Sequence, residues 1–453
     1  MSRLQMQVVP GIVGVLVLTA GTALSQESPK PDNPPSESEF KLYDQGGIVV
    51  DGVAYFTGTD SPGKDHVAAF DVHTLRRLKT YAFAETYDSS PMLFQKKDGA
   101  WLIIAHEHKK ARTVALNRDT GQVEWISDAN QPGTIFFGFS YYDLADGTKL
   151  ILSPCSNGLH AMDAETGKDV WWVKAGPTGG VTPCVDQEKG WIFYQSSGKV
   201  MKISATDGRV LKSVNVSGPS RCSSWNTVLV NDSHGYFVAT RWYGKPEWDS
   251  AIRVYDKDLD LVWEKTGLPI GKKSTLTYAE GKLVFGGGNC WAKRPEGDPI
   301  DYGYLGDEWK YVAAYEIGTG DIAWKCDLVD HDFTSIMNVP FFKGFFYAET
   351  QNGPFASKIL RIAAGSGELQ ETLDYGRPIT SCGQCIMGHG LILSGDLKEH
   401  RLVITRVAEG SKADWPGPFG DPQTNQMALP DDGNARLVPM KELGRAKPDR
   451  PKK

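Results

Sequence analysis

The sequence predicts an all-β fold, an eight-bladed β-propeller whose blades are joined by docking tryptophans. Three observations support this prediction. Short extended runs alternate with turn residues, and the chain holds 49 Gly and 11% aromatic residues, as expected of many short strands. No segment shows a long 3.6-residue apolar period, which would indicate helices. A short string that ends in tryptophan recurs along the chain, and internal repeats of this kind are typical of propellers.

The recurring string has the skeleton Ala-x-(Asp/Asn/Glu)-x-x-Thr-Gly-x-x-x-Trp. Full copies run from Ala115 to Trp125, from Ala161 to Trp171 and from Ala314 to Trp324, and weaker copies fill the gaps. The residues at the glycine position are numbers 75, 121, 167, 208, 260, 320, 367 and 410. The intervals between them are 46, 46, 41, 52, 60, 47 and 43 residues. Because a four-stranded blade takes about 40–50 residues, these eight marks predict eight blades.

Each part of the string has a structural role. The acidic residue or Asn can hydrogen-bond its own turn, and the glycine takes the left-handed conformation that closes the hairpin. The tryptophan on the next strand has a large apolar area that can dock against the neighbouring blade. One blade cannot bury both of its faces, so the ring should be closed, and we expect a strand near Phe40 to Tyr43 to complete the last blade. The predicted docking residues are Trp125, Trp171, Trp263 and Trp324.

The two ends of the chain differ from the middle. Residues 1–25 have the features of a signal peptide cleaved near Ser25, with Arg3 before an apolar run and small residues at the cleavage site. Residues 26–38 form a Pro-rich linker, residues 39–412 the propeller, and residues 413–453 a Pro/Gly-rich basic tail. We therefore expect a periplasmic or secreted protein with no transmembrane span in the mature chain. The net charge of −6 argues against nucleic acid as a partner.

The repeat resembles that of the pyrroloquinoline quinone (PQQ) propellers over residues 39 to about 412. That superfamily includes PQQ-dependent alcohol dehydrogenases and the BamB scaffold subunit of the outer-membrane barrel-assembly machinery. The resemblance implies the fold and leaves the activity open. The dehydrogenases carry two adjacent cysteines beside the quinone, calcium ligands and a catalytic Asp, and this sequence matches none of them. No two cysteines are adjacent here, because they stand at positions 155, 184, 222, 290, 326, 382 and 385. We therefore expect no bound cofactor.

The cysteines and histidines offer weaker indications. Cys382 and Cys385 have haem-like spacing, but Ile386 stands where a haem site needs His, so a local disulfide or two buried thiols is favoured. Cys184 and Cys222 precede inner strands and are expected near the channel as buried core residues. Strand alternation puts His106 and His108 on one side, a feasible corner for a divalent metal. The alternative for these two histidines is an exposed polar loop.

The long intervals of 52 and 60 residues indicate insertions in blades five and six that emerge on one face of the ring. Aromatic residues beside Arg and carboxylates on long loops suit a recognition surface. The alternative is that these loops pack on each other and cover the channel mouth. The candidate binding residues are Arg241, Trp242, Tyr243, Trp248, Asp249, Trp291, Arg294, Asp301, Tyr302, Tyr304, Asp307 and Trp309.

Three functions fit these observations. The first is a non-enzymatic scaffold of the cell envelope that binds a partner protein or a polar, carbohydrate-like ligand. The second is an enzyme that acts on a carbohydrate-like substrate at the face with the blade-five and blade-six loops. The third is a PQQ-dependent oxidoreductase. The sequence favours the scaffold, because it shows no catalytic constellation and requires no cofactor.

Overall fold

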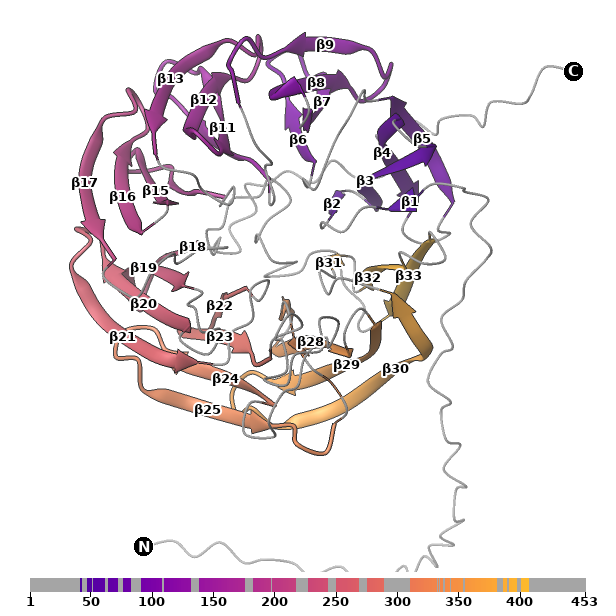
Figure 1. Ribbon diagram of the computed structural model, residues 1–453, viewed down its shortest axis with the longest axis vertical. Coiled ribbons are helices and arrows are strands. Elements are labelled where there is room, and N and C mark those ends of the chain that lie inside the picture. The colour runs from indigo at the N-terminus through magenta and orange to yellow at the C-terminus, as the bar shows by residue number, and fades with distance from the viewer. Residues whose placement is uncertain are drawn as a thin grey trace, which may run out of the picture.

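A computed structural model of the chain shows short strands arranged in sheets around a centre (Figure 1). It describes residues 41–42, 47–50, 52–61, 64–71, 76–82, 91–107, 110–131, 138–175, 182–196, 198–216, 227–242, 250–268, 275–288, 310–331, 333, 335–336, 339–342, 344–352, 355–380, 386–388, 391–396 and 401–406. This part of the chain holds the strands β1 to β33 and no α-helix. Accordingly, it contains no helix long and apolar enough to cross a membrane. The predicted signal peptide, linker and basic tail lie outside it.

The strands form eight antiparallel sheets, numbered here in chain order. Sheet 1 holds β1 (Lys41–Leu42), β2 (Ile48–Val50), β3 (Val53–Ser61), β4 (Lys64–Asp71) and β5 (Arg77–Ala82). Sheet 2 holds β6 (Met92–Gln95), β7 (Trp101–Glu107), β8 (Arg112–Asn117) and β9 (Val123–Ile126). Sheet 3 holds β10 (Ser140–Asp143), β11 (Lys149–Cys155), β12 (Gly158–Asp163) and β13 (Asp169–Lys174). Sheet 4 holds β14 (Cys184–Asp186), β15 (Trp191–Ser196), β16 (Lys199–Ser204) and β17 (Val210–Asn215).

The second half of the chain repeats this plan. Sheet 5 holds β18 (Thr227–Asp232), β19 (Gly235–Trp242), β20 (Ser250–Asp256) and β21 (Leu261–Leu268). Sheet 6 holds β22 (Thr277–Ala279), β23 (Lys282–Gly286), β24 (Tyr311–Glu316) and β25 (Ile322–Asp327). Sheet 7 holds β26 (Ser335–Ile336), β27 (Phe341–Phe342), β28 (Phe345–Asn352), β29 (Phe355–Ala363) and β30 (Leu369–Thr380). Sheet 8 holds β31 (Ile386–Gly388), β32 (Leu391–Asp396) and β33 (Arg401–Arg406).

This all-β architecture is the β-propeller that the repeat predicts. Within sheets 3 to 6 the chain runs from the innermost strand outward, so β18 and β22 lie toward the centre and β13, β17, β21 and β25 lie on the rim (Figure 1). Sheet 8 lies beside sheet 1, where β31 contacts β2. The ring therefore brings the two ends of the described chain together.

The expected closure by an N-terminal strand was wrong. Lys41 and Leu42 form β1, which pairs with Thr59 and Gly58 of β3 in sheet 1, and β1 does not extend sheet 8. The reason lies in strand length, because β2 pairs only with Val53–Tyr55 at the start of β3. Pairing with β1 satisfies backbone groups farther along the inner edge of this longer strand, which would otherwise lack partners.

The tryptophans at the end of the repeat contact the next sheet in the ring. Each donates a hydrogen bond from Nε1 to a backbone carbonyl there, and each is nearly buried. The four bonds are Trp125 to Ala164 at 3.0 Å, Trp171 to Ala205 at 3.0 Å, Trp263 to Ile317 at 2.7 Å and Trp324 to Ala364 at 2.7 Å. In each case the acceptor lies three residues before the turn glycine of the next repeat, as Ala205 does before Gly208. One contact thus recurs at four junctions between sheets.

The turn glycine is required at these contacts for two reasons. Gly208 has φ +71°, a left-handed conformation that other residues adopt at a cost. A Cβ on Gly208 would also lie only 2.7 Å from Cε3 of Trp171. The glycine therefore lets the indole ring lie flat against the turn of the next sheet.

The junction between sheets 4 and 5 departs from this pattern. Lys212 stands at the tryptophan position, and its Nζ is paired with Asp260 at 2.6 Å. The left-handed turn residue is Leu259, with φ +57°, so the mark placed at residue 260 was one residue late. Leu259 packs into an apolar cluster shared by both sheets. An ion pair and a leucine therefore replace the tryptophan–glycine contact at this junction.

Candidate binding site between sheets 2 and 3

Two of the predicted loop residues are not on a loop. Arg241 and Trp242 end strand β19, where they pair with Ile252 and Ala251 of β20. Both side chains are fully buried, with exposed fractions of 0% and 1%. The expectation that these two residues are exposed was therefore wrong, because strand β19 continues through both positions and Trp242 packs in an apolar cluster shared by sheets 4 and 5. The other ten candidates, Tyr243, Trp248, Asp249, Trp291, Arg294, Asp301, Tyr302, Tyr304, Asp307 and Trp309, lie outside the described residues, and their role stays a prediction.

The histidine corner is described only in part. His106 lies near the end of β7, is fully buried and pairs with Thr113 of β8. His108 lies outside the described residues. Within the described ranges, no group of three or more His, Cys, Asp or Glu side chains could hold a metal ion. His106 nevertheless belongs to a polar region, because the interface between sheets 2 and 3 holds several buried polar side chains.

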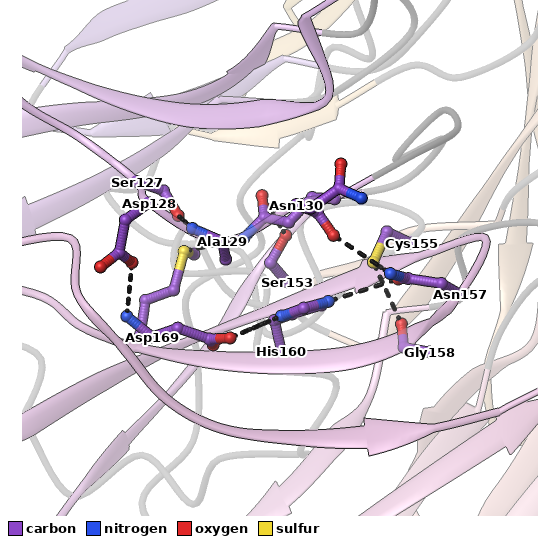
Figure 2. Close-up of polar contacts among 12 residues, drawn as sticks. Ser127, Asp128, Ala129, Asn130, Ser153, Cys155, Asn157, Gly158, His160 and Asp169 are labelled. Carbon is purple, nitrogen blue, oxygen red and sulfur yellow. Dashed lines mark hydrogen bonds and ion pairs between the residues drawn. The ribbon is translucent and has the colours of Figure 1, made fainter.

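His160 is at the centre of this polar region. It lies on β12, is only 3% exposed, and both of its ring nitrogens face oxygen atoms. Nδ1 is 3.1 Å from Oδ2 of Asp169, and Nε2 is 3.3 Å from Oδ1 of Asn157 (Figure 2). The backbone N–H of Asp169 in turn donates to Asp128, which follows the outer strand of sheet 2, at 3.0 Å. The imidazole is therefore held from two sides, and its carboxylate partner is tied to the neighbouring sheet.

Asn157 connects the histidine to a buried thiol and to sheet 2. Its Oδ1 accepts a hydrogen bond from Sγ of Cys155 at 2.8 Å, and its Nδ2 donates to the carbonyl of Asn130 at 3.1 Å (Figure 2). Burial raises the pKa of the Cys155 thiol to about 12. A thiol with this pKa stays protonated near neutral pH and is a poor nucleophile. Cys155 therefore acts here as a hydrogen-bond donor within the network.

Gln131 links the two sheets deeper in the interface. Its Oε1 accepts hydrogen bonds from the hydroxyl of Thr113 in sheet 2 at 2.6 Å and from that of Ser153 in sheet 3 at 3.5 Å. Ser153 pairs directly with His160 across the strands β11 and β12. The polar contacts therefore extend from Thr113 in sheet 2, which pairs with His106, to Asp169 on the outer strand of sheet 3.

Trp172 lies over this network at the surface. It pairs with His160 across β12 and β13, and the two rings stack with centroids 5.6 Å apart and planes at 14°. Trp172 is 46% exposed, while His160 is buried. One ring face therefore rests on a fixed imidazole, and the opposite face is available to solvent. A Cβ at Gly158 would lie 3.0 Å from Trp172 Nε1, so this glycine allows the ring to approach the backbone.

The exposed apolar side chains share one location in the ring. Among the described residues, every large hydrophobic side chain classed as exposed lies on an outer strand or within two residues of its end. They are Leu78, Val123, Ile126, Val170, Trp172, Val210, Leu211, Leu261, Val262, Ile322 and Val329. Trp172 is the one aromatic residue among them. Rigid, partly exposed aromatic residues are frequent anchors of protein interfaces.

Reasoning from the sequence missed Trp172, although an indication was present. The chain reads Val170-Trp171-Trp172-Val173, and only Trp171 was assigned a role. Successive residues of a strand point to opposite faces of the sheet. If Trp171 faces sheet 4, Trp172 must therefore face sheet 2, where the shorter outer strand β9 leaves it partly uncovered.

Comparisons with known proteins agree with this architecture. A family model described as outer membrane protein assembly factor BamB, of the PQQ-repeat type, matches residues 88–240 and 156–298. These segments span sheets 2 to 5 and the first two strands of sheet 6, and they include Trp125, Trp171 and Trp263. The chain is a PQQ-like β-propeller.

The relatives of this PQQ-like propeller are distant. It is 33% identical over 138 residues to a quinoprotein ethanol dehydrogenase of Pseudomonas putida, a match that covers 27% of this chain and 22% of the relative. Among solved structures, BamB from Moraxella catarrhalis has a TM-score of 0.49 at 9% identity, over 82% of this chain and 94% of BamB. Hydrazine synthase of Kuenenia stuttgartiensis has a TM-score of 0.46 at 10% identity, over 71% of this chain and 96% of that one.

The described cysteines of this PQQ-like propeller include no adjacent pair of the kind expected beside the quinone of the dehydrogenases. Cys155, Cys184 and Cys326 are buried and lie in three different sheets. Cys184 begins β14, and its Sγ donates to the carbonyl of Thr227 on the next inner strand at 2.8 Å. Its position near the centre is the one expected from the sequence, whereas Cys222 lies outside the described residues. The thiols of the described cysteines thus serve packing and hydrogen bonding.

Proposed function

We propose that this PQQ-like propeller is a non-enzymatic scaffold of the cell envelope that binds a partner protein. The observation that carries the proposal is Trp172, a half-exposed ring fixed from below by His160. Fixing the ring before binding lowers the entropy lost when a partner docks. Two further points support an envelope location: the signal peptide predicted for residues 1–25, and the match to a family model named for an outer membrane assembly factor.

The test is site-specific cross-linking in living cells. A photoreactive phenylalanine analogue replaces Trp172 in one variant and Leu261 in a control variant, since Leu261 is 53% exposed on the outer strand of sheet 5. The proposal expects irradiation to give a discrete cross-linked species from position 172 and much less from position 261. Mass spectrometry then identifies the partner. Equal labelling at both positions, or none at position 172, would contradict the proposal.

The envelope location has its own test. Cells that express the chain are separated into periplasmic, membrane and cytoplasmic fractions, and the mature N-terminus is sequenced. A scaffold of the envelope should appear outside the cytoplasm with an N-terminus near Gln26. A chain that keeps residues 1–25 and stays in the cytoplasm would refute this part of the proposal.

A second candidate, a PQQ-dependent oxidoreductase, is favoured by one observation, the match to quinoprotein ethanol dehydrogenase. The match covers less than a quarter of that enzyme, and the described cysteines do not fit its kind of site. Dye-linked alcohol oxidation by the purified protein with added PQQ and calcium would contradict the scaffold function and support this second candidate.

A further inference from the structure

We infer that the outer edge of β13 binds an extended segment of the partner as an additional antiparallel strand, with the apolar face of that segment on Trp172. This inference rests on the proposed scaffold function and specifies the kind of partner that it binds. It starts from the topology of sheet 3. The strand order is β10-β11-β12-β13, so β13 ends the sheet and its outer edge pairs with no described strand. An edge of this kind can accept main-chain hydrogen bonds from another chain.

From Val170 to Lys174, beyond a β-bulge that separates Trp171 from Asp169, the side chains of β13 alternate in a way that suits strand addition. Val170, Trp172 and Lys174 are exposed, while Trp171 and Val173 between them are buried. An added strand would therefore place every second side chain beside this exposed row. Two of the three positions in the row are apolar, and the third is a lysine at the end of the strand.

The charges at the two ends set the direction and composition of the added strand. Lys174 is exposed and forms no ion pair with a described residue. Asp169, at the other end, is 30% exposed, and Asp128 lies next to it. Opposite charges directly across a pair of strands are favourable, and like charges are unfavourable. The complementary antiparallel segment has an acidic residue opposite Lys174, apolar residues opposite Trp172 and Val170, and a basic residue opposite Asp169.

β13 is the best supported of the outer strands for this role. The exposed large hydrophobic side chains of β9, β17, β21 and β25 are aliphatic, whereas β13 carries the aromatic ring. The ring is also fixed by the stacked His160, which Asp169 and Asn157 hold in place. Cross-strand pairs that include an aromatic residue are among the more stabilising pairs in sheets.

The experiment uses a synthetic peptide and hydrogen exchange of the full-length protein. The peptide is acetylated and amidated and has the central sequence Glu-Thr-Trp-Thr-Val-Lys, with threonines on both sides for solubility. A second peptide has Lys in place of the Glu. Amide exchange is followed by mass spectrometry at rising peptide concentration. Strand addition should slow exchange in residues 169–174, because the outward amides of β13 become hydrogen-bonded.

Three variants make the result specific. Trp172→Ala should weaken binding of the Glu peptide about tenfold, as expected for an interface anchor. Lys174→Glu should reverse the preference between the two peptides, and this exposed residue can change without disturbing the core. Leu261→Ala, a matched change on another outer strand, should bind both peptides as the unaltered protein does.

Several outcomes would overturn the inference. These are an absence of protection in residues 169–174 at millimolar peptide, equal protection of other outer strands, or an unchanged peptide preference in Lys174→Glu. Protection of β13 that appears at high protein concentration without peptide would identify a second copy of this chain as the occupant. A cross-linked partner at position 172 without protection of the amides of residues 169–174 would support the scaffold function and refute strand addition. Peptide binding without any cross-linked species would refute the scaffold instead.

Discussion

Replacing Gly208 with alanine tests the contact that joins neighbouring sheets. Gly208 has φ +71°, and an added Cβ would lie 2.7 Å from Cε3 and 2.8 Å from Cδ2 of Trp171. A left-handed conformation costs alanine about 1–2 kcal/mol. Moving the buried indole costs a further ~1–3 kcal/mol, as overpacking does, and strains the bond from Trp171 to Ala205. We expect Gly208→Ala to lower the free energy of unfolding by about 3 kcal/mol.

The matched control is Gly198→Ala in the same sheet. Gly198 also has φ +71°, but no atom lies within 4 Å of its added Cβ. This change should therefore cost only the conformational term of about 1 kcal/mol. Urea unfolding followed by circular dichroism gives both values, and the difference of about 2 kcal/mol measures the packing contact.

A double-mutant cycle completes the test. Trp171→Ala alone should cost about 3–5 kcal/mol, as large buried aromatic residues do. In that background Gly208→Ala should cost no more than Gly198→Ala, because the space beside the turn is then empty. If Gly208→Ala and Gly198→Ala are equally costly in the unaltered protein, the ring does not rest on the turn, and the explanation of the repeat is wrong.

Three further predictions concern the core, pH and cofactor. Trp242→Ala should cost about 3–5 kcal/mol of unfolding free energy, because Trp242 is 1% exposed; a loss below about 1 kcal/mol in urea unfolding would contradict its burial. Burial raises the pKa of the Cys155 thiol to about 12 from the ordinary value of 9. The contribution of the protonated thiol to the free energy of unfolding is therefore intact below pH 9 and falls as the pH rises toward 12. At pH 10 the loss is about 1 kcal/mol, and Cys155→Ala should show a correspondingly smaller difference between pH 8 and pH 10. PQQ with calcium should leave the melting temperature unchanged, since only ligands that favour the native state raise it; a clear rise would favour the oxidoreductase.

The propeller was predictable because both residue types of its inter-sheet contact recur in one short string, although the contact itself joins residues of different repeats, such as Trp171 and Gly208. The turn glycine and the tryptophan lie four residues apart, so both appear in one short string. The position of β1 could not be predicted in this way, because it depends on how much of β3 remains unpaired by β2. That property belongs to the folded sheet.

The candidate site was harder to predict because its residues come from separate repeats. Asp128 and Asn130 follow the outer strand of sheet 2, whereas Asn157, His160 and Asp169 belong to sheet 3. No spacing rule connects them, since they meet only where two sheets pack. The loops of blades five and six were predicted from long repeat intervals and from composition, and Arg241 and Trp242 show that neither establishes exposure.

The placement of the docking tryptophans bears on the proposed function. Trp125 and Trp171 connect sheets 2, 3 and 4, while Trp263 and Trp324 connect sheets 5, 6 and 7. Between these two groups, Lys212 and Asp260 form an ion pair instead. Sheet 3 thus has a docked tryptophan on both of its faces. Trp172, on its outer strand, therefore belongs to a part of the ring held on both sides. An anchor on such a support loses little freedom when a partner binds, which is the property that a scaffold requires.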